Sequence, residues 1–318
     1  MEPAPFHGVP PGGIAPDNVW WMTAADGTRL RAAHWEGRRG GALAVLLSGR
    51  TEYLEKFALP AAYMVQRGYQ VVSLDWRGQG LSDRAVDPHL KGHIGDFSEF
   101  QLDLDALLDS DPVQSVAPGP RVLIAHSMGG AIATGALMRM ELAGYFDAAV
   151  LSAPMYGIAL PLPMRLAARV VTGIGMALGK GEKWPPFGDV STPYVLTDAD
   201  PNVLTHDPEI WDWLVQMGRD HDALNLAMPT ISWFSAATRE MNRLRGGDKL
   251  GLPAFCVLGG AEEVVDPKAV RRTCANLGIE LAEIPGARHE HYHEAPEFRD
   301  QAWRAIDGFL TGQGLPAL

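Results

Sequence analysis

The chain has 318 residues, of which 47% are hydrophobic and 20% are charged. This composition is typical of a globular protein and excludes a disordered or fibrous chain. Its 38 acidic and 27 basic side chains give a net charge of −11, which argues against binding to the phosphate backbone of nucleic acids.

The N-terminal segment has no basic start followed by an apolar run, and the chain contains no apolar stretch of about 20 residues. We therefore expect no signal peptide, no transmembrane helix and a cytoplasmic location. Residues 1–18 are rich in Pro and Gly, which predicts a flexible arm. Cys256 and Cys274 form no C-x-x-C pair, so a zinc ribbon and a disulfide scaffold are excluded. Two buried thiols are expected, and a single disulfide between them is the alternative.

Eight segments have the pattern of β-strands. Asp26 and Gly27 separate the first two and indicate a hairpin. Most of the later segments are continuous apolar runs, which suit strands buried on both faces of a parallel sheet. The segments are residues 19–23, 29–35, 42–47, 70–74, 122–125, 148–151, 254–258 and 279–284.

Helical patterns alternate with these strands. In the first of them Pro60 is expected in the first turn, with Gly68 just past the end. The alternation predicts an α/β fold with a mostly parallel sheet of about eight strands and helices on both faces, formed by residues 19–153 and 249–318. The helices are expected at residues 60–67, 97–108, 128–142, 267–277 and 296–310.

Residues 154–248 interrupt this alternation. They contain no clear strand and concentrate Pro, Met and Trp, so we expect a helical cap inserted before the strand at 254–258. Within the cap, residues 162–178 predict a helix that is apolar around most of its circumference. Such a helix either packs inside the cap or presents apolar surface to an acyl chain or a bilayer.

The only polar stripe of this helix contains Arg165, Arg169 and Thr172, at i, i+4 and i+7. Together with Lys180 and Lys183, the two arginines predict a locally basic patch in an acidic protein. This patch suggests attraction to a phosphate head group or to an anionic membrane, hence peripheral contact with the inner membrane through the cap. Solvated surface charge is an equal alternative.

The strongest chemical signal surrounds Ser127. A buried strand leads into Ala125-His126-Ser127-Met128-Gly129, and a helix follows, which is the context of a nucleophile elbow. Small residues are needed two positions before and after the serine, where strand and helix backbones approach closely. Ala125 and Gly129 meet this need. The alternative is an ordinary glycine-rich helix start.

A nucleophilic serine needs a base and an orienting acid, here in the order Ser, acid, His. His289 follows the last strand and is the expected base. The run from His289 to His293 also resembles a metal-binding cluster, but its spacing fits no known site, so no metal and no cofactor are expected. In the loop after residues 254–258, Glu262 and Asp266 compete as the acid. Position favours Glu262, and Asp266 before Pro267 is also a natural helix N-cap.

An oxyanion hole needs two backbone N–H groups. We expect them from Met128 and from Arg50, in the turn that follows the strand at 42–47. A second loop, residues 75–82, contains a G-x-G but lacks the third glycine of a dinucleotide-binding loop. Bracing of the neighbouring loops is its expected role.

The elbow, the D-x-R-G-x-G-x-S loop at 75–82 and the G-A-x-H at 286–289 together resemble the α/β-hydrolase family of monoacylglycerol lipases and bacterial lysophospholipases. The G-R-x-E stretch at 49–52 is most similar to the lysophospholipase branch. The resemblance spans residues 20–310. It implies the α/β-hydrolase fold, with Ser127 as nucleophile, Glu262 as acid and His289 as base. Ala125 and Glu262 stand where many members carry Gly and Asp.

The resemblance implies a serine hydrolase that cleaves the carboxylic ester of single-chain acyl lipids, lysophospholipids or monoacylglycerols, through an acyl-enzyme. A short-chain carboxylesterase, or an amidase or peptidase on the same triad, is the alternative. A lipid-binding protein without catalytic activity is a third hypothesis.

Overall fold

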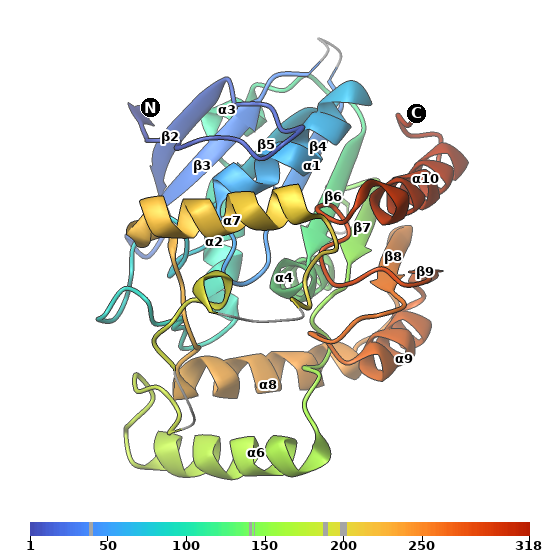
Figure 1. Cartoon of the computed structure of the whole chain (residues 1–318). Helices are drawn as coiled ribbons and strands as arrows, with labels where there is room; N and C mark the ends of the chain where they lie inside the picture. Colours follow the sequence, from blue (N-terminus) through green and yellow to red (C-terminus); the bar gives the residue numbers. More distant parts are fainter. Residues whose placement is uncertain (38–40, 140–141, 143, 187–189, 198–201) are drawn as a thin grey trace.

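The computed structural model describes residues 1–37, 41–139, 142, 144–186, 190–197 and 202–318. One sheet of nine strands runs through the molecule in the order β1-β2-β3-β5-β4-β6-β7-β8-β9 (Figure 1). The strands are β1 Glu2–Pro3, β2 Asn18–Thr23, β3 Arg29–Trp35, β4 Leu43–Leu47, β5 Gln70–Leu74, β6 Arg121–His126, β7 Ala148–Ser152, β8 Ala254–Gly259 and β9 Glu280–Ile284.

The strands from β4 to β9 pair in parallel, and β1, β2 and β3 form an antiparallel edge. The predicted mostly parallel sheet is therefore confirmed, and all eight expected strands are present. The ninth strand, β1, was not expected. It lies in the segment predicted to be a flexible arm, where Glu2 pairs with Trp21 and Pro3 with Trp20.

The rest of this N-terminal segment is also held against the core. The backbone N–H of His7 donates to Glu55, and the buried Arg31 guanidinium donates to the carbonyl of Pro5. Further along, the Trp35 indole N–H donates to the carbonyl of Ile14. Proline and glycine thus allow an extended path across the surface here, because side chains of the core satisfy its backbone groups.

Helices cover both faces of the sheet, as predicted. Outside the insertion between β7 and β8 they are α1 Leu54–Gln66, α2 Ser98–Leu108, α3 Asp111–Gln114, α4 Met128–Leu137, α9 Pro267–Leu277 and α10 Pro296–Gly312. On one face α1 and α10 pack Phe57 and Trp303 against the sheet. On the other face α2, α4 and α9 contribute Leu104, Ile132 and Val270.

Helix α1 begins earlier than the sequence predicted. Pro60 was expected in its first turn, but the helix starts at Leu54 and Pro60 lies in its interior. Proline has no N–H, so the carbonyl of Lys56, four residues earlier, has no intrahelical donor. His293 Nε2 lies 2.8 Å from that carbonyl oxygen and satisfies it. A contact from the far end of the chain therefore makes the interior proline tolerable.

Between β7 and β8 lie α6 Leu162–Ala177, α7 Pro208–Asp220 and α8 Ile231–Arg245, with two short 3₁₀ turns, Tyr194–Leu196 and Asp222–Leu224. The part of this insertion that the structure describes adds no strand to the sheet, as expected. Helix α8 packs on α4, and α7 packs on α1 through Ile210, Leu214 and Leu59. Helix α6 lies outside α8 (Figure 1), and Gly175 is its one buried residue. The alternative of a helix buried inside the cap is therefore wrong.

Within the described residues, no helix combines the length and the apolar character that crossing a bilayer requires. Cys256 and Cys274 are both free and buried.

Candidate active site

Ser127 stands at a sharp turn between β6 and α4. Its backbone angles are φ 51° and ψ −117°, a region that non-glycine residues rarely adopt. Gly129 allows the turn, since a Cβ there would lie 2.4 Å from the carbonyl oxygen of Ser48. The strand-to-helix context expected of a nucleophile elbow is thus present. Strain of this kind persists where the surrounding structure over-determines it, and it lifts the hydroxyl above the sheet.

The structure brings Ser127, His289 and Glu262 together from three separate loops. Ser127 Oγ lies 3.0 Å from His289 Nε2, and His289 Nδ1 lies 2.8 Å from Glu262 Oε2. All three residues are buried. The loops follow β6, β8 and β9, whose carboxyl ends meet at one edge of the parallel sheet. The arrangement is a continuous hydrogen-bond chain from hydroxyl to carboxylate.

Glu262 is held ionised by its surroundings. Burial opposes its charge, but the attraction and hydrogen bond of His289, with backbone N–H donors from Val265 and Val264, outweigh burial and lower the pKa of Glu262 to about 2. Asp266, the alternative acid, points elsewhere. Its carboxylate accepts from the backbone N–H groups of Lys268 and Ala269 and so caps α9.

Two backbone N–H groups next to Ser127 in the chain or in the adjoining turn have no acceptor among the described residues. Within the described part of the chain, neither Arg50 N–H nor Met128 N–H donates to another residue. These are the two donors expected for an oxyanion hole. Gln79 braces the turn that carries Arg50, because its side-chain amide donates to the Gly49 carbonyl and accepts from the Thr51 N–H. The bracing role expected of loop 75–82 is therefore confirmed.

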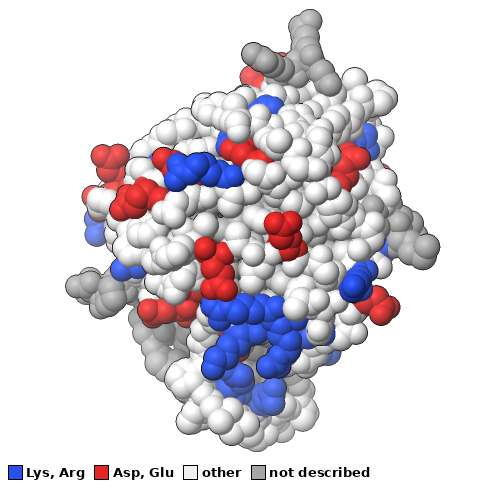
Figure 2. Space-filling model, turned by 90° about the vertical axis from the view of Figure 1, so that its right-hand side faces the viewer, with Lys and Arg blue, Asp and Glu red and all other residues white. Residues whose placement is uncertain are grey.

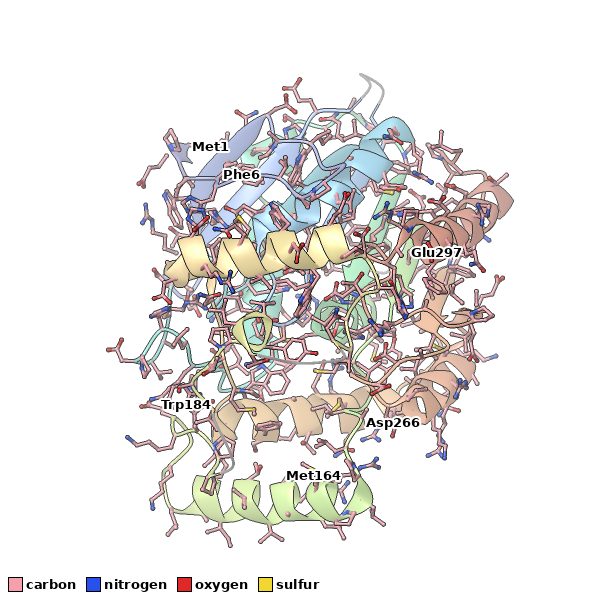
Figure 3. The ribbon with its side chains drawn as sticks, in the orientation of Figure 1. Met1, Phe6, Met164, Trp184, Asp266 and Glu297 are labelled. Atoms are coloured by element: carbon pink, nitrogen blue, oxygen red, sulfur yellow. The ribbon has the colours of Figure 1, made fainter. Side chains whose placement is uncertain are left out.

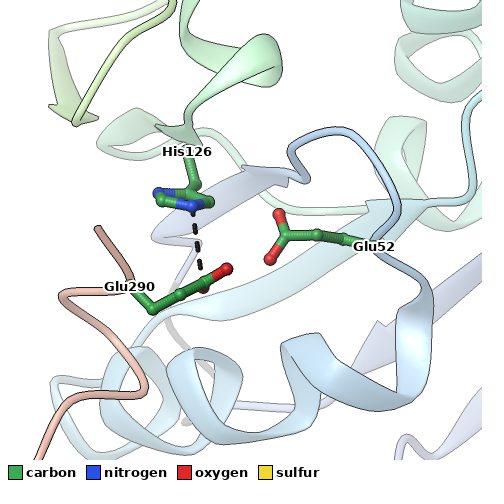
Figure 4. A group of neighbouring side chains, drawn as sticks. All are labelled: Glu52, His126 and Glu290. Carbon is green, nitrogen blue, oxygen red and sulfur yellow. Dashed lines mark ion pairs between the residues drawn. The ribbon is translucent and has the colours of Figure 1, made fainter. Parts of the chain in front are cut away.

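A buried charged cluster lies beneath this turn and was missed by sequence reasoning. Lys56 Nζ pairs with Glu52 Oε1 at 2.6 Å and with Glu290 Oε1 at 2.7 Å. Figure 4 shows the imidazole of His126 above Glu290, with 3.6 Å between Nε2 and Oε2. The other oxygen of Glu52 accepts from the Gly49 N–H. The cluster therefore fixes both the turn at Gly49 and Arg50 and the residue before Ser127.

The ligand atoms of Glu52, His126 and Glu290 lie within 4.8 Å of one another, a spacing that a metal ion could bridge. The Lys56 ammonium, however, already pairs with both carboxylates and offsets one of their two negative charges. Burial disfavours the charged imidazole, but Glu290 and Glu52 outweigh burial and raise the pKa of His126. The one sequence signal for this cluster was the i, i+4 spacing of Glu52 and Lys56.

A cavity of about 580 Å³ opens above Ser127 and His289, a volume typical of ligand-binding pockets. The insertion supplies much of its wall, and most of the wall is apolar, with Met164, Leu214, Leu226, Trp233 and Phe234 among the lining residues. Figure 3 labels Met164 on α6, in the outermost layer beyond α8. An apolar cavity ending at a serine hydroxyl suits an acyl chain attached to a polar, cleavable group.

Comparison with known proteins agrees with this geometry. The family model described as "Serine aminopeptidase, S33" matches residues 40–296. Lysophospholipase L2 of Escherichia coli strain K12 is 30% identical over 317 residues, covering 93% of this chain and 88% of that protein. A probable lysophospholipase L2 of Haemophilus influenzae is 30% identical over 275 residues, covering 85% of this chain and 84% of that protein.

Solved structures with the same fold include a monoglyceride lipase of Saccharomyces cerevisiae. It superposes with a TM-score of 0.71 at 16% identity, covering 98% of this chain and all of that one. A monoacylglycerol lipase of Paleococcus ferrophilus gives a TM-score of 0.66 at 19% identity, covering 89% of this chain and 99% of that one. At these identities the likeness shows the α/β-hydrolase fold alone.

Proposed function

This chain belongs to the serine aminopeptidase S33 family of α/β-hydrolases, and we propose that it cleaves the carboxylic ester of single-chain acyl lipids, lysophospholipids or monoacylglycerols. The observation that carries the proposal is the hydrogen-bond chain from Ser127 through His289 to Glu262 at the floor of an apolar cavity. The relatives named lysophospholipase L2 support the substrate class.

In the proposed mechanism Ser127 Oγ attacks the ester carbonyl while His289 Nε2 takes its proton. Glu262 holds Nδ1–H and stabilises the imidazolium that forms. The N–H groups of Arg50 and Met128 hold the oxyanion, each contributing about 3 kcal/mol to transition-state stabilisation. His289 then protonates the leaving glycerol oxygen. Water, deprotonated by the same imidazole, releases the fatty acid from the acyl-enzyme.

The test is fatty-acid release from lysophosphatidylcholine, monoacylglycerol and a short p-nitrophenyl ester, with Ser127→Ala as the inactive control. A fluorophosphonate should label the wild type and not the variant. Burial of each methylene is worth about 0.8 kcal/mol, so kcat/KM should rise about fourfold per methylene until the cavity is filled. A flat chain-length profile would favour the short-chain esterase, amidase or peptidase. Binding of lipid without turnover would favour a binding protein.

We further propose that residues 154–248 act as a cap that contacts an anionic bilayer. Of the ten exposed large hydrophobic residues in the described chain, seven lie between Leu162 and Leu178, on or just after α6. Figure 2 shows a basic patch beside this helix. The pKa of Arg245 is lowered mainly by burial. The charges of Arg165, Arg169 and Arg272 lower it further, so these three arginines lie close to Arg245.

This patch differs from the one the sequence predicted. The carbonyl of Lys183 accepts a hydrogen bond from the backbone N–H of Ile231, the first residue of α8, whereas Arg245 is the last residue of that helix. Fifteen residues of helix span about 22 Å, so Lys183 lies far from the arginine cluster. Apolar helix surface flanked by arginines is the chemistry that binds an anionic bilayer interface. Such contact would place the enzyme on the cytoplasmic face of the inner membrane.

Vesicle co-sedimentation tests this contact. Arg165→Gln with Arg169→Gln should weaken binding to vesicles containing phosphatidylglycerol and leave binding to neutral vesicles unchanged. Leu166→Ser with Val170→Ser should weaken both. Equal binding by all three proteins would contradict the proposal.

A further inference from the structure

Arg50 lies in the wall of the cavity, and none of the described carboxylates forms an ion pair with it. Its Nη2 donates to the carbonyl of Ala227, and its buried Nε has no acceptor in the part of the chain that the structure describes. Burial lowers the pKa of Arg50 to about 9. By contrast, the buried Arg31 pairs with Glu55 and Asp75. The oxyanion role expected of Arg50 uses only its backbone N–H and leaves its side chain without a function.

The guanidinium is held firmly in place. It packs against Gly92, where a Cβ would lie 2.8 Å from Nη2, and its Cζ lies 5.5 Å from the centroid of the Trp233 ring. A guanidinium fixed in this way presents its remaining donors in one orientation, the arrangement that suits bidentate binding of a phosphate. Part of its desolvation has already occurred in folding, so an arriving anion gains more from it than from a fully solvated side chain.

The turn that carries Arg50 lies directly beside the nucleophile. A Cβ on the preceding residue, Gly49, would lie 3.0 Å from Ser127 Cβ. In a lysophospholipid only the short glycerol unit separates the ester from the phosphate, so a phosphate-binding group must lie close to the serine. Arg165 and Arg169, suggested by sequence for the head group, do not line the cavity, and Arg165 pairs with Asp266 on the outer surface.

We propose that the Arg50 side chain binds the phosphate of a lysophospholipid and makes the enzyme select this class over neutral monoacylglycerols. The inference rests on the proposed function, because the ester must lie at Ser127 and the acyl chain in the cavity. The carboxylate of the fatty-acid product offers similar anionic chemistry, and the experiments below separate the two sources.

The first experiment compares lysophosphatidylglycerol with monoacylglycerol of the same acyl chain, both below their micellar concentrations so that surface binding does not contribute. Arg50→Gln keeps the backbone N–H and should lower the ratio of kcat/KM for the lysophospholipid to kcat/KM for monoacylglycerol by about 10- to 100-fold, the loss of a charge-assisted pair. Gly92→Ala, which pushes on the guanidinium, should shift selectivity in the same direction. Arg271→Gln, an exposed pair with Glu283, is the charge-matched control and should change neither substrate.

Equal losses on both substrates would overturn the inference and leave the ester hydrolase intact. Unchanged selectivity, with relief of product inhibition by fatty acid in Arg50→Gln, would also overturn it and assign the site to the carboxylate.

The second experiment does not depend on turnover. In a Ser127→Ala background, calorimetry measures binding of the same two lipids with and without Arg50→Gln. Selective loss of lysophospholipid binding supports the inference even if wild-type hydrolysis proves weak. If Ser127→Ala binds the lysophospholipid with the same affinity with and without Arg50→Gln, the inference is overturned, whatever the activity of the wild type.

Discussion

Replacing Glu262 by Gln should inactivate the enzyme without removing any atom that packs. Glu262 Oε1 accepts from the backbone N–H groups of Val264 and Val265, at 2.7 and 3.0 Å, and Oε2 faces His289 Nδ1 at 2.8 Å. In the glutamine variant the two backbone donors still require an oxygen. They therefore fix the amide so that its NH₂ group points at His289.

The consequence is the wrong imidazole tautomer. Nδ1 must then accept a hydrogen bond, so the proton moves to Nε2, the nitrogen that should take the proton from Ser127 at 3.0 Å. The same exchange of acid for amide in serine proteases lowers kcat by about 10⁴-fold, and we expect a loss of about this size. KM should change little, because Glu262 is not among the residues that line the cavity.

The matched control is Asp266→Asn. Asparagine caps a helix as well as aspartate does, so α9 keeps its N-terminus and activity should stay close to that of the wild type. The assay is steady-state hydrolysis of monoacylglycerol by both variants, with circular dichroism to verify folding. Inactivation by Asp266→Asn together with an active, folded Glu262→Gln would refute the reasoning and reverse the acid assignment.

Three further predictions concern stability. Lys56→Met leaves Glu52 and Glu290 buried without their cation, and urea unfolding should show a loss of about 3–5 kcal/mol; a loss below about 1 kcal/mol would contradict this. On folding, the pKa of the Glu262 carboxyl falls from 4.5 to about 2. One pKa unit is worth about 1.4 kcal/mol, so above pH 4.5 the ionised carboxylate contributes about 3 kcal/mol to the free energy of unfolding. This contribution is lost as the pH falls towards 2. Urea titrations at pH 6 and 3 should therefore show a smaller loss in Glu262→Gln than in the wild type, and equal losses would exclude this contribution. Gly129→Ala brings a methyl within 2.4 Å of the Ser48 carbonyl and should lower both the melting temperature and activity, so a variant with wild-type values for both would show that the turn relaxes freely.

Most strands and helices of the fold could be predicted from local sequence patterns. Apolar runs and helical spacing depend on neighbours within one element, and the helix expected at 267–277 has those bounds in the structure. The prediction for Pro60 was wrong because the group that satisfies the freed Lys56 carbonyl, His293, is separated from it by 237 residues. No short window of sequence contains that information.

The sequence by itself determined the strand–Ser127–helix turn and an imidazole after the last strand, since both are local features of chain direction and residue type. Only the tertiary structure decided which carboxylate faces His289, because Glu262 and Asp266 sit in one loop and differ only in where it points them. The same holds for the Lys56 cluster and for the Arg50 guanidinium in the cavity wall, which forms no ion pair with a described carboxylate. The energy of a buried charge depends on the groups that folding brings around it, and those come from distant parts of the chain.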